Sequence, residues 1–251
     1  MTQTVLLSVA DGIAEIVLNR PERLNAINPA LLADFAAAIR AAQADPDVGV
    51  ILLRGAGRAF CAGDDLKEFD DQSRGPAETR EFIEAIQDIT RLLMGGDAIV
   101  VGAIHGWAVG GGLEWVINCD LAVMAEGCRC FFPETALGLF VTGGVTALLP
   151  NHVGLQKAKE MILLGDRFDA RAALDMGLVA RVVPDQACLD EARGLARRIA
   201  GLPAHSRRNV KRVLNRAFQL PLDQAMALET DATVEGFLAP ETAALIARAA
   251  P

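Results

Sequence analysis

The apolar residues of this chain fall into two kinds of block, which predict an alternation of strands and helices. Val5 to Val9 and Ile13 to Leu18 flank an Asp-Gly turn and predict an opening hairpin. Short β-branched runs predict buried strands at 48–53, 99–104, 121–125, 129–132 and 181–183, and helical spacing predicts helices at 28–43, 76–94, 154–164 and 170–176. Only helical patterns follow Pro184. We therefore expect an α/β core over residues 1–184 and a helical C-terminal region over 185–251.

A run of three glycines, Gly110 to Gly112, separates the strand predicted at 99–104 from a short apolar helix. Consecutive glycines cost backbone entropy, so they indicate a position that needs positive φ or a close approach to the backbone. A helix that begins there directs unpaired N–H groups and the positive end of its dipole at whatever approaches. We expect an anion, or an oxygen that gains negative charge, to bind at this point.

Two glutamates flank this region. Glu114 falls in the first turn of the helix, and Glu134 follows Pro133, a natural first residue of a helix. Each glutamate could simply complement a helix dipole. However, the helix carries the chain about 10 Å away, and the two strands that follow it can return over a similar distance. Both carboxylates are therefore candidates to face the same oxygen-binding backbone.

Composition and charge narrow the classes of function. Of the 251 residues, 52% are apolar and 22% are charged, which is typical of a globular protein with a substantial core. The formal charge of −8 argues against a broad surface for nucleic acid or an anionic membrane. The sequence contains no run of about 18 apolar residues and no basic segment ahead of an apolar stretch at its start. We expect a soluble, cytoplasmic protein that binds neither nucleic acid nor membrane.

Metal and redox chemistry are not expected. The five cysteines are scattered and mostly lie in apolar sequence, which favours reduced core residues. Cys128 and Cys130 lack the two-residue gap of thioredoxin-type or zinc-type pairs, and the three histidines are isolated. The Gly-x-Gly at 55–57 follows a predicted strand, as in dinucleotide-binding folds, but Phe60 stands where the third small residue is needed. The residues predict no metal site.

Several motifs together resemble the signature of the enoyl-CoA hydratase/isomerase (crotonase) family. They are Ala108 to Glu114, Cys119-Asp120, Phe132-Pro133-Glu134, Asn19 to Ala26, Gly57 to Gly63, and Gly165-Asp166-Arg167 with Ala172 and Gly177-Leu178-Val179 beyond it. They cover nearly the whole chain, and jointly they are specific. The resemblance implies an α/β fold built as a crotonase-like spiral of repeated ββα units, followed by a helical C-terminal region.

The resemblance also implies an activity. A hydratase of this family adds water to a trans-2-enoyl-CoA to give a 3-hydroxyacyl-CoA, with the coenzyme A thioester as substrate and no separate cofactor. The N–H groups of Asp64 and Gly111 would bind the thioester oxygen, while Glu114 would act as base and Glu134 as acid. Other residues expected at the acyl-CoA site are Arg23, Leu24, Ala26, Ala62, Asp65, Leu66 and Gly110, with Lys211 and Phe237 near the coenzyme's phosphates and adenine.

Assembly is expected as well. The resemblance implies a homotrimer, or a hexamer made of two trimers. The C-terminal helices carry apolar rows, Ala225, Leu228 and Ala232 on one and Val213 and Ala217 on another, that need a partner surface.

Asp64 departs from the family pattern, which usually has a small residue at this position. A carboxylate that pointed into an oxyanion pocket would weaken the pocket electrostatically. We therefore expect the Asp64 side chain to point outward, while its backbone N–H serves the pocket.

Other activities stay open. Isomerisation of a 3-enoyl-CoA needs only one carboxylate, so the presence of both glutamates favours hydration. Dehalogenases, decarboxylases and hydrolases also use this scaffold, and Phe140-Val141-Thr142 departs from the common hydratase pattern, which leaves the acyl group undetermined. The alternative from a different class is a non-catalytic acyl-CoA-binding or RNA-binding relative, which the acidity and the paired glutamates oppose.

Overall fold

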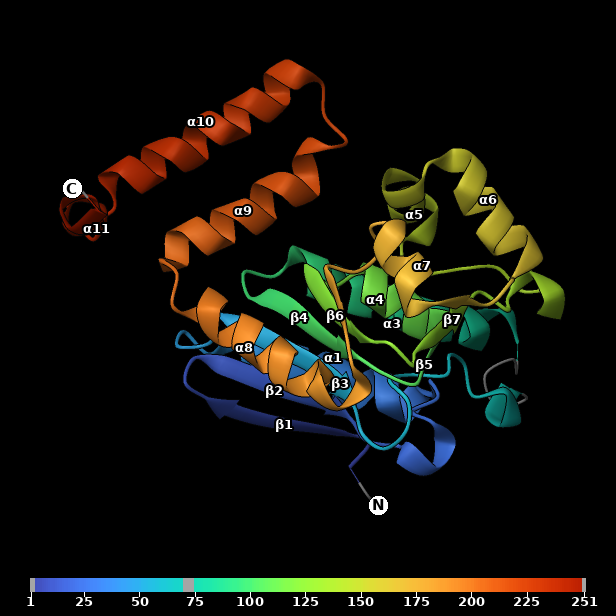
Figure 1. The fold of residues 1–251 in the computed structure, drawn as a ribbon. Coiled ribbons are helices and arrows are strands. Elements are labelled where there is room, and N and C mark those ends of the chain that lie inside the picture. Colours follow the sequence, from blue (N-terminus) through green and yellow to red (C-terminus); the bar gives the residue numbers. More distant parts are fainter. Residues whose placement is uncertain (1–2, 70–74, 250–251) are drawn as a thin grey trace.

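The computed structural model describes residues 3–69 and 75–249 and has the expected α/β architecture (Figure 1). A six-stranded sheet has the order β1-β2-β3-β4-β6-β9, and a three-stranded sheet has the order β5-β7-β8. The pairs β1–β2 and β7–β8 are antiparallel, and the other pairs are parallel. The strands are β1 Val5–Ala10, β2 Ile13–Leu18, β3 Val50–Gly55, β4 Ile99–Ile104, β5 Trp107–Val109, β6 Leu121–Ala125, β7 Arg129–Phe131, β8 Phe168–Asp169 and β9 Arg181–Val183.

From β4 to β7 the strands alternate between the two sheets, because β4 leads directly into β5 and β6 leads directly into β7. Each of these two turns of the chain therefore adds one strand to each sheet, which produces a spiral. The α-helices are α1 Pro29–Ala44, α3 Pro76–Gly95, α4 Gly111–Ile117, α5 Val145–Val153, α6 Leu155–Leu164, α7 Ala170–Asp175, α8 Cys188–Ala200, α9 Ala204–Ala217, α10 Leu222–Leu238 and α11 Thr242–Ala249. None of the helices in the described part of the chain is long and apolar enough to cross a membrane.

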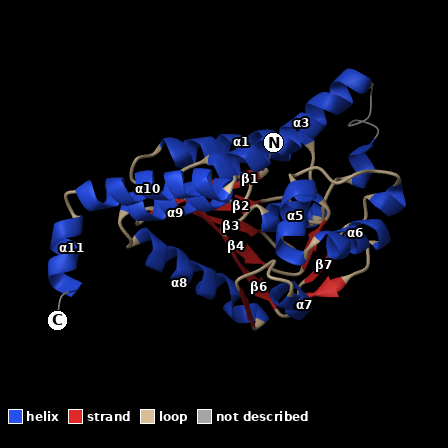
Figure 2. Cartoon of the chain, turned by 90° about the horizontal axis from the view of Figure 1, so that it is seen from above, coloured by secondary structure: helices blue, strands red, loops and turns tan. Residues whose placement is uncertain are grey.

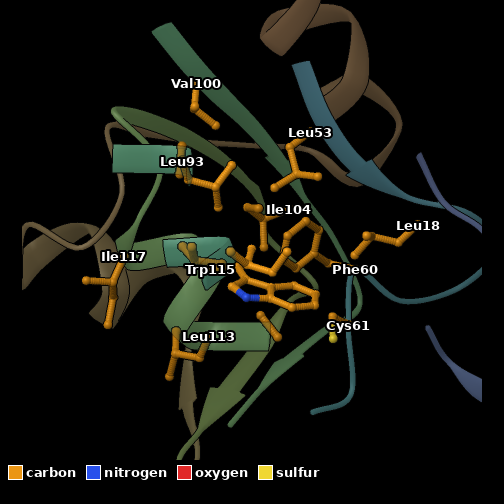
Figure 3. Packing of buried hydrophobic residues seen from close by; sticks show 14 of the residues in the cluster. Leu18, Leu53, Phe60, Cys61, Leu93, Val100, Ile104, Leu113, Trp115 and Ile117 are labelled. Carbon is orange, nitrogen blue, oxygen red and sulfur yellow. The ribbon is translucent and has the colours of Figure 1, made fainter. Parts of the chain in front are cut away.

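Helices cover both faces of the six-stranded sheet. α8 buries Cys188, Ala192, Leu195 and Ala196 against one face. The larger apolar cluster lies on the other side and includes α1, α3 and α4. Trp115 of α4 lies within this cluster beside Phe60 and Ile104 (Figure 3), and its ring meets Phe35 edge-on with 5.0 Å between the ring centroids. The helix that begins at the glycine run is thus held by packing on all sides.

The helices after Pro184 divide into two groups. α8 packs on the sheet, whereas α9, α10 and α11 project away from it, with α10 running back alongside α9 (Figures 1 and 2). We call α9–α11 the C-terminal arm. The helical region 185–251 therefore does not form one unit, because its first long helix completes the core.

Most elements begin and end within a few residues of their predicted positions. Side chains cap two of these helices: Asn28 accepts a hydrogen bond from the N–H of Leu31, and Asp169 accepts one from the N–H of Ala172. The strands β5 and β8 were not predicted because they have only 3 and 2 residues, and α5 was not predicted because it contains Pro150. Pro133 does not open an α-helix, since only the 3-10 turn Thr135–Leu137 follows Glu134.

The parallel strands β3 and β4 bring together the segments that follow them. The N–H of Phe60 donates to the carbonyl of His105 at 2.8 Å, and the N–H of Cys61 donates to Trp107 at 3.0 Å. Val109 then donates back to Cys61 at 3.0 Å. The loop after β3 therefore lies alongside β5, immediately ahead of the glycine run.

Candidate active site

Two backbone donors face outward where the loop after β3 meets the start of α4. Ile27 N donates to Gly63 O at 2.8 Å and Asp65 N donates to Ile27 O at 2.9 Å, so the intervening N–H of Asp64 lies on the opposite side of this ladder. Gly111 is the first residue of α4, where an N–H has no helical acceptor. Within the described residues, neither N–H donates a hydrogen bond. Both groups are therefore free to donate to an incoming oxygen.

The glycine run has both features that the sequence indicated, a positive φ and a close approach to the backbone. Gly110 has a φ of +50°, and a methyl group on it would lie 2.4 Å from Glu134 Oε1. A methyl group on Gly112 would lie 2.4 Å from the carbonyl oxygen of Cys61. Positive φ and close approach both require glycine. The run therefore lets α4 begin in contact with the loop after β3 and with Glu134.

Glu114 is fully buried, and three hydrogen-bond donors hold its carboxylate. Thr142 donates its N–H to Oε1 at 2.7 Å and its hydroxyl to Oε2 at 2.9 Å, and Gly143 N donates to Oε2 at 2.9 Å. Burial raises the pKa of Glu114, and these three donors oppose that rise. A carboxylate has about four lone-pair positions, so one position on Glu114 stays open to a further donor.

The segment that holds Glu114 is itself anchored. Asn118, one turn further along α4, donates from Nδ2 to the carbonyl of Gly143 at 3.0 Å and accepts from Thr90 Oγ1 at 2.7 Å. Sequence reasoning missed the role of Thr142, which it treated as part of an unusual apolar stretch. Its 28-residue separation from Glu114 gives no local signal of the contact. Thr142 is therefore a positioning residue that only the fold reveals.

Glu134 lies on the other side of the glycine run and has no such support. Its Oε2 atom is buried and has no hydrogen-bond partner in the chain as described. Burial is the main cause that raises the pKa of Glu134 to about 7; a hydrogen bond from its own backbone opposes the rise, and the nearby charges of Glu114 and Asp64 add to it. The two glutamates thus differ sharply in surroundings, because Glu114 accepts hydrogen bonds from three donors and Glu134 keeps an unpaired oxygen.

The Asp64 side chain points toward the glutamates, not outward as expected from the sequence. A methyl group on Gly111 would lie 3.9 Å from both Asp64 Oδ1 and Glu114 Oε2. Burial, followed by the charge of Glu114, raises the pKa of Asp64 to about 6. The reason for the inward orientation is the parallel bridge to Ile27, which fixes the backbone of the loop on both sides of Asp64. Three carboxyl groups therefore converge beside the two free N–H donors.

Asp65 serves a different purpose from Asp64. Its two oxygens accept from Arg23, at 2.6 Å from Nη2 and 3.2 Å from Nε, and Arg20 Nη2 lies 3.0 Å from Oδ2. Burial would raise the pKa of Asp65, but the hydrogen bonds and charges of Arg23 and Arg20 lower it. Arg20 also pairs with Glu68 at 2.9 Å. This network ties the loop after β2 to the loop after β3, so Asp65 holds the site together from outside.

The other predicted residues near the loop after β2 include both buried and exposed side chains. Leu24 has a φ of +53°, and its carbonyl accepts from Ala62 N at 3.1 Å. Ala26 is buried, and Leu66 is 56% exposed. Asn25, which sequence reasoning did not single out, donates from its buried amide to the carbonyls of Ala56, Ala59 and Phe60 at 2.8–3.1 Å. These contacts place the predicted acyl-CoA segments next to one another.

Two other predicted residues lie away from the carboxyl groups. Lys211 is buried, and its ammonium group contacts Asp120 Oδ2 at 2.9 Å, Leu93 O at 2.6 Å and Ala98 O at 2.8 Å. Its three protons are used within the chain, which leaves Lys211 none to donate to a phosphate, contrary to the prediction from the sequence. Phe237 is 78% exposed near the end of α10 in the C-terminal arm.

The chemistry open to this arrangement follows from its charges. Among the described residues, no group of three or more His, Cys, Asp and Glu side chains is arranged to hold a metal ion. Two free N–H groups can stabilise negative charge on an oxygen. Carboxyl groups with raised pKa values can hold and release protons near neutral pH. The site is therefore suited to proton transfer next to a carbonyl group.

Comparisons with known proteins agree with this chemistry. The profile of the family described as enoyl-CoA hydratase/isomerase matches residues 8–240. A Mycobacterium bovis protein named probable enoyl-CoA hydratase is 34% identical over 227 residues, which are 90% of this chain and 87% of the relative. The 1,2-epoxyphenylacetyl-CoA isomerase of Escherichia coli is 33% identical over 233 residues, covering 92% of this chain and 89% of the relative.

Solved structures match over the full chain. The enoyl-CoA hydratase from Thermoplasma volcanium superposes with a TM-score of 0.92 and 29% identity, and the match covers 100% of this chain and 98% of that protein. The spiral fold predicted from the sequence motifs is confirmed by this similarity.

Proposed function

The chain belongs to the enoyl-CoA hydratase/isomerase family, and from that premise we propose that it adds water to a trans-2-enoyl-CoA. The observation that carries the proposal is the unequal pair of glutamates beside two free N–H donors. Glu114 accepts three hydrogen bonds, whereas Glu134 keeps a buried oxygen without a partner. Hydration needs one base and one acid at the same double bond, and this pair offers both.

The thioester oxygen of the substrate would accept hydrogen bonds from the N–H groups of Asp64 and Gly111. As water attacks the β-carbon, negative charge moves onto this oxygen and gives an enolate. The two donors are fixed by the ladder with Ile27 and by the start of α4, so they need no reorganisation when the charge develops. Their contribution is therefore greatest at the enolate-like transition state.

The glutamates would divide the proton transfers. Glu114 has one lone-pair position left, from which it can accept a proton of the attacking water as oxygen bonds to the β-carbon. Glu134, whose raised pKa keeps it partly protonated near neutral pH, would give its proton to the α-carbon. The product is a 3-hydroxyacyl-CoA, and a proton returns from Glu114 to Glu134 through solvent to complete the cycle.

The proposal is tested with crotonyl-CoA by following loss of absorbance of the conjugated enoyl thioester. We expect Glu114→Gln and Glu134→Gln each to lower kcat by about 10²- to 10⁴-fold, the usual cost of losing a general acid or base. Glu160→Gln is the matched control, because Glu160 is exposed on α6 and, among the described residues, pairs only with Lys157. Full hydration by either active-site variant would contradict the two-carboxylate mechanism, and formation of a 3-enoyl-CoA would favour isomerisation.

The pH dependence tests the assignment of the acid. Because Glu134 must be protonated, kcat/KM is expected to fall by about tenfold per pH unit as pH rises above about 7. The residual activity of Glu134→Gln should lack this alkaline limb. A limb that persists in the variant would assign the titration to another group.

The residues proposed to contact coenzyme A are Arg23, Leu24, Ala26, Ala62, Leu66 and Gly110, while Phe237 is proposed to reach the adenine of a neighbouring subunit's substrate. This requires an assembly, and we propose a homotrimer or a hexamer of two trimers. Support comes from the C-terminal arm, which exposes Val210, Leu214, Phe218, Met226, Val234, Phe237 and Leu238. A cavity of about 560 Å³ between α9 and the core is lined by several of these side chains.

A further inference from the structure

The Asp64 carboxyl group has no hydrogen-bond partner within the described chain, although it is half-buried at the site. Glu114, by contrast, accepts hydrogen bonds from Thr142 and Gly143. Glu134 has one oxygen, Oε2, that is buried and has no hydrogen-bond partner among the described residues. The proposed hydration already uses Glu114 and Glu134, so Asp64 is an additional polar group that the mechanism does not require.

The position of Asp64 in the loop after β3 places its side chain next to the proposed substrate. Its N–H is a proposed donor to the thioester oxygen, so its side chain lies beside the first carbons of the acyl group. Asp64 Oδ1 and Glu114 Oε2 are both 3.9 Å from the position of a methyl group on Gly111. The Asp64 carboxyl group and the proposed base therefore both lie next to Gly111, close to where the reacting double bond would be.

The charged surroundings offer Asp64 no partner. Glu114 faces it from α4, and Glu134 faces it from the segment after β7. The nearest arginines, Arg20 and Arg23, already bind Asp65 and Glu68. An unpaired acid in these surroundings tends to hold its proton, and a hydrocarbon chain that displaced water from it would leave it without any hydrogen bond.

We propose that Asp64 determines specificity, by selecting enoyl thioesters whose acyl group carries a hydroxyl group close to the double bond. A hydroxyl group can accept a hydrogen bond from a protonated Asp64 and donate one to an ionised Asp64, so it suits both states. A site built to pair with a polar substituent disfavours the analogue that lacks it, because its own buried group is then left unpaired. This inference rests on the proposed hydration and specifies its substrate class.

The test compares crotonyl-CoA with 4-hydroxycrotonyl-CoA, which differ only by the hydroxyl group. For the wild-type protein we expect kcat/KM to favour the hydroxylated substrate by about tenfold or more. Asp64→Ala keeps the backbone N–H and should abolish this preference, so that kcat/KM becomes equal for the two substrates. Asp64→Asn can still donate and accept, so it should retain the preference. Asp190→Asn, at a side chain 84% exposed on α8, is the control for loss of a charge.

The outcomes separate the inference from the proposed function. If wild-type protein hydrates crotonyl-CoA but shows no preference, or if Asp64→Ala keeps the preference, the specificity role is wrong. An equal loss of kcat on both substrates in folded Asp64→Ala and Asp64→Asn, with a changed pH profile, would also overturn it and place Asp64 among the proton-transfer groups. If neither thioester is turned over by the wild type, the proposed hydration itself fails. Circular dichroism and thermal unfolding establish that each variant is folded.

Discussion

The helix α4 and the helix α10 show two opposite ways in which this chain places a helix. All 7 residues of α4 are buried, whereas only Ala225 is buried among the 17 residues of α10. α4 is also in contact with the loop after β3, where Gly112 leaves no room for a methyl group. α10 lies against α9 and exposes apolar side chains such as Met226 and Val234. The first helix is positioned by its own chain, and the second has surface left for a partner.

This difference separates two requirements of the proposed function. The N–H donors and the glutamates depend on contacts within the core, so one folded chain can build them. The arm carries Phe237 near the end of α10, a helix that projects away from the sheets and the carboxyl groups of its own chain (Figure 1). Chemistry and assembly therefore depend on different regions, and substitutions should affect them separately.

Lys211 marks the junction between the two regions. It lies on α9, yet its ammonium group is buried against Asp120 and two carbonyl groups of the core. A buried ion pair anchors the start of the arm strongly only while both partners are present. Breaking this contact is the most direct way to test whether the arm is needed for a stable core.

The largest expected effect on stability is therefore that of Lys211→Met. The substitution leaves Asp120 buried without its cation and should lower the free energy of unfolding by about 3–5 kcal/mol, measured by denaturant titration. The double variant Lys211→Met/Asp120→Asn should recover part of the loss, because Asn can still accept from Val100 N, which lies 2.7 Å from Asp120 Oδ2. Wild-type stability in the single variant would show that the arm is not anchored through this pair.

Glycine-to-alanine substitutions compare the two regions directly. Gly112→Ala places a methyl group against the Cys61 carbonyl and should cost about 1–3 kcal/mol of unfolding free energy, together with most activity. Gly236→Ala lies in α10, where the nearest atom to the new methyl group would be 3.9 Å away. It should leave activity unchanged and stabilise the helix by up to about 1 kcal/mol. Equal effects at the two positions in thermal unfolding would remove the contrast between core and arm.

The smallest effect on the single chain is expected from Leu214→Asp in the arm. Leu214 is 64% exposed, so its replacement should change the unfolding free energy of one subunit by only about 0.5 kcal/mol. The mass from light scattering should nevertheless fall from that of a trimer or hexamer toward a monomer, because a charge would be buried in an apolar interface. Gln224→Asp, at an exposed polar position of α10, is the control. A monomeric wild-type protein would contradict the assembly.

The sequence by itself determined the local structure of this protein and the parts of the site that local structure carries. Apolar periodicity located most strands and helices, and Asn28 and Asp169 are residue types that favour the N-cap positions they occupy. The glycine run indicated a close approach of the backbone, and Glu114 was placed in the first turn of the helix that follows. These features depend on propensities and spacings within a few residues, which a sequence displays directly.

Only the tertiary structure decided how the polar side chains pair. Thr142 holds Glu114 across 28 residues, and Lys211 reaches Leu93 across 118. Asp64 and Asp65 are neighbours of the same chemical type, yet one turns toward the glutamates and the other binds two arginines. A one-residue step in an extended segment reverses the direction of the side chain, and what lies on each side is set by distant parts of the chain. The partners of a charged residue, and with them its pKa, therefore follow from the fold and not from local sequence.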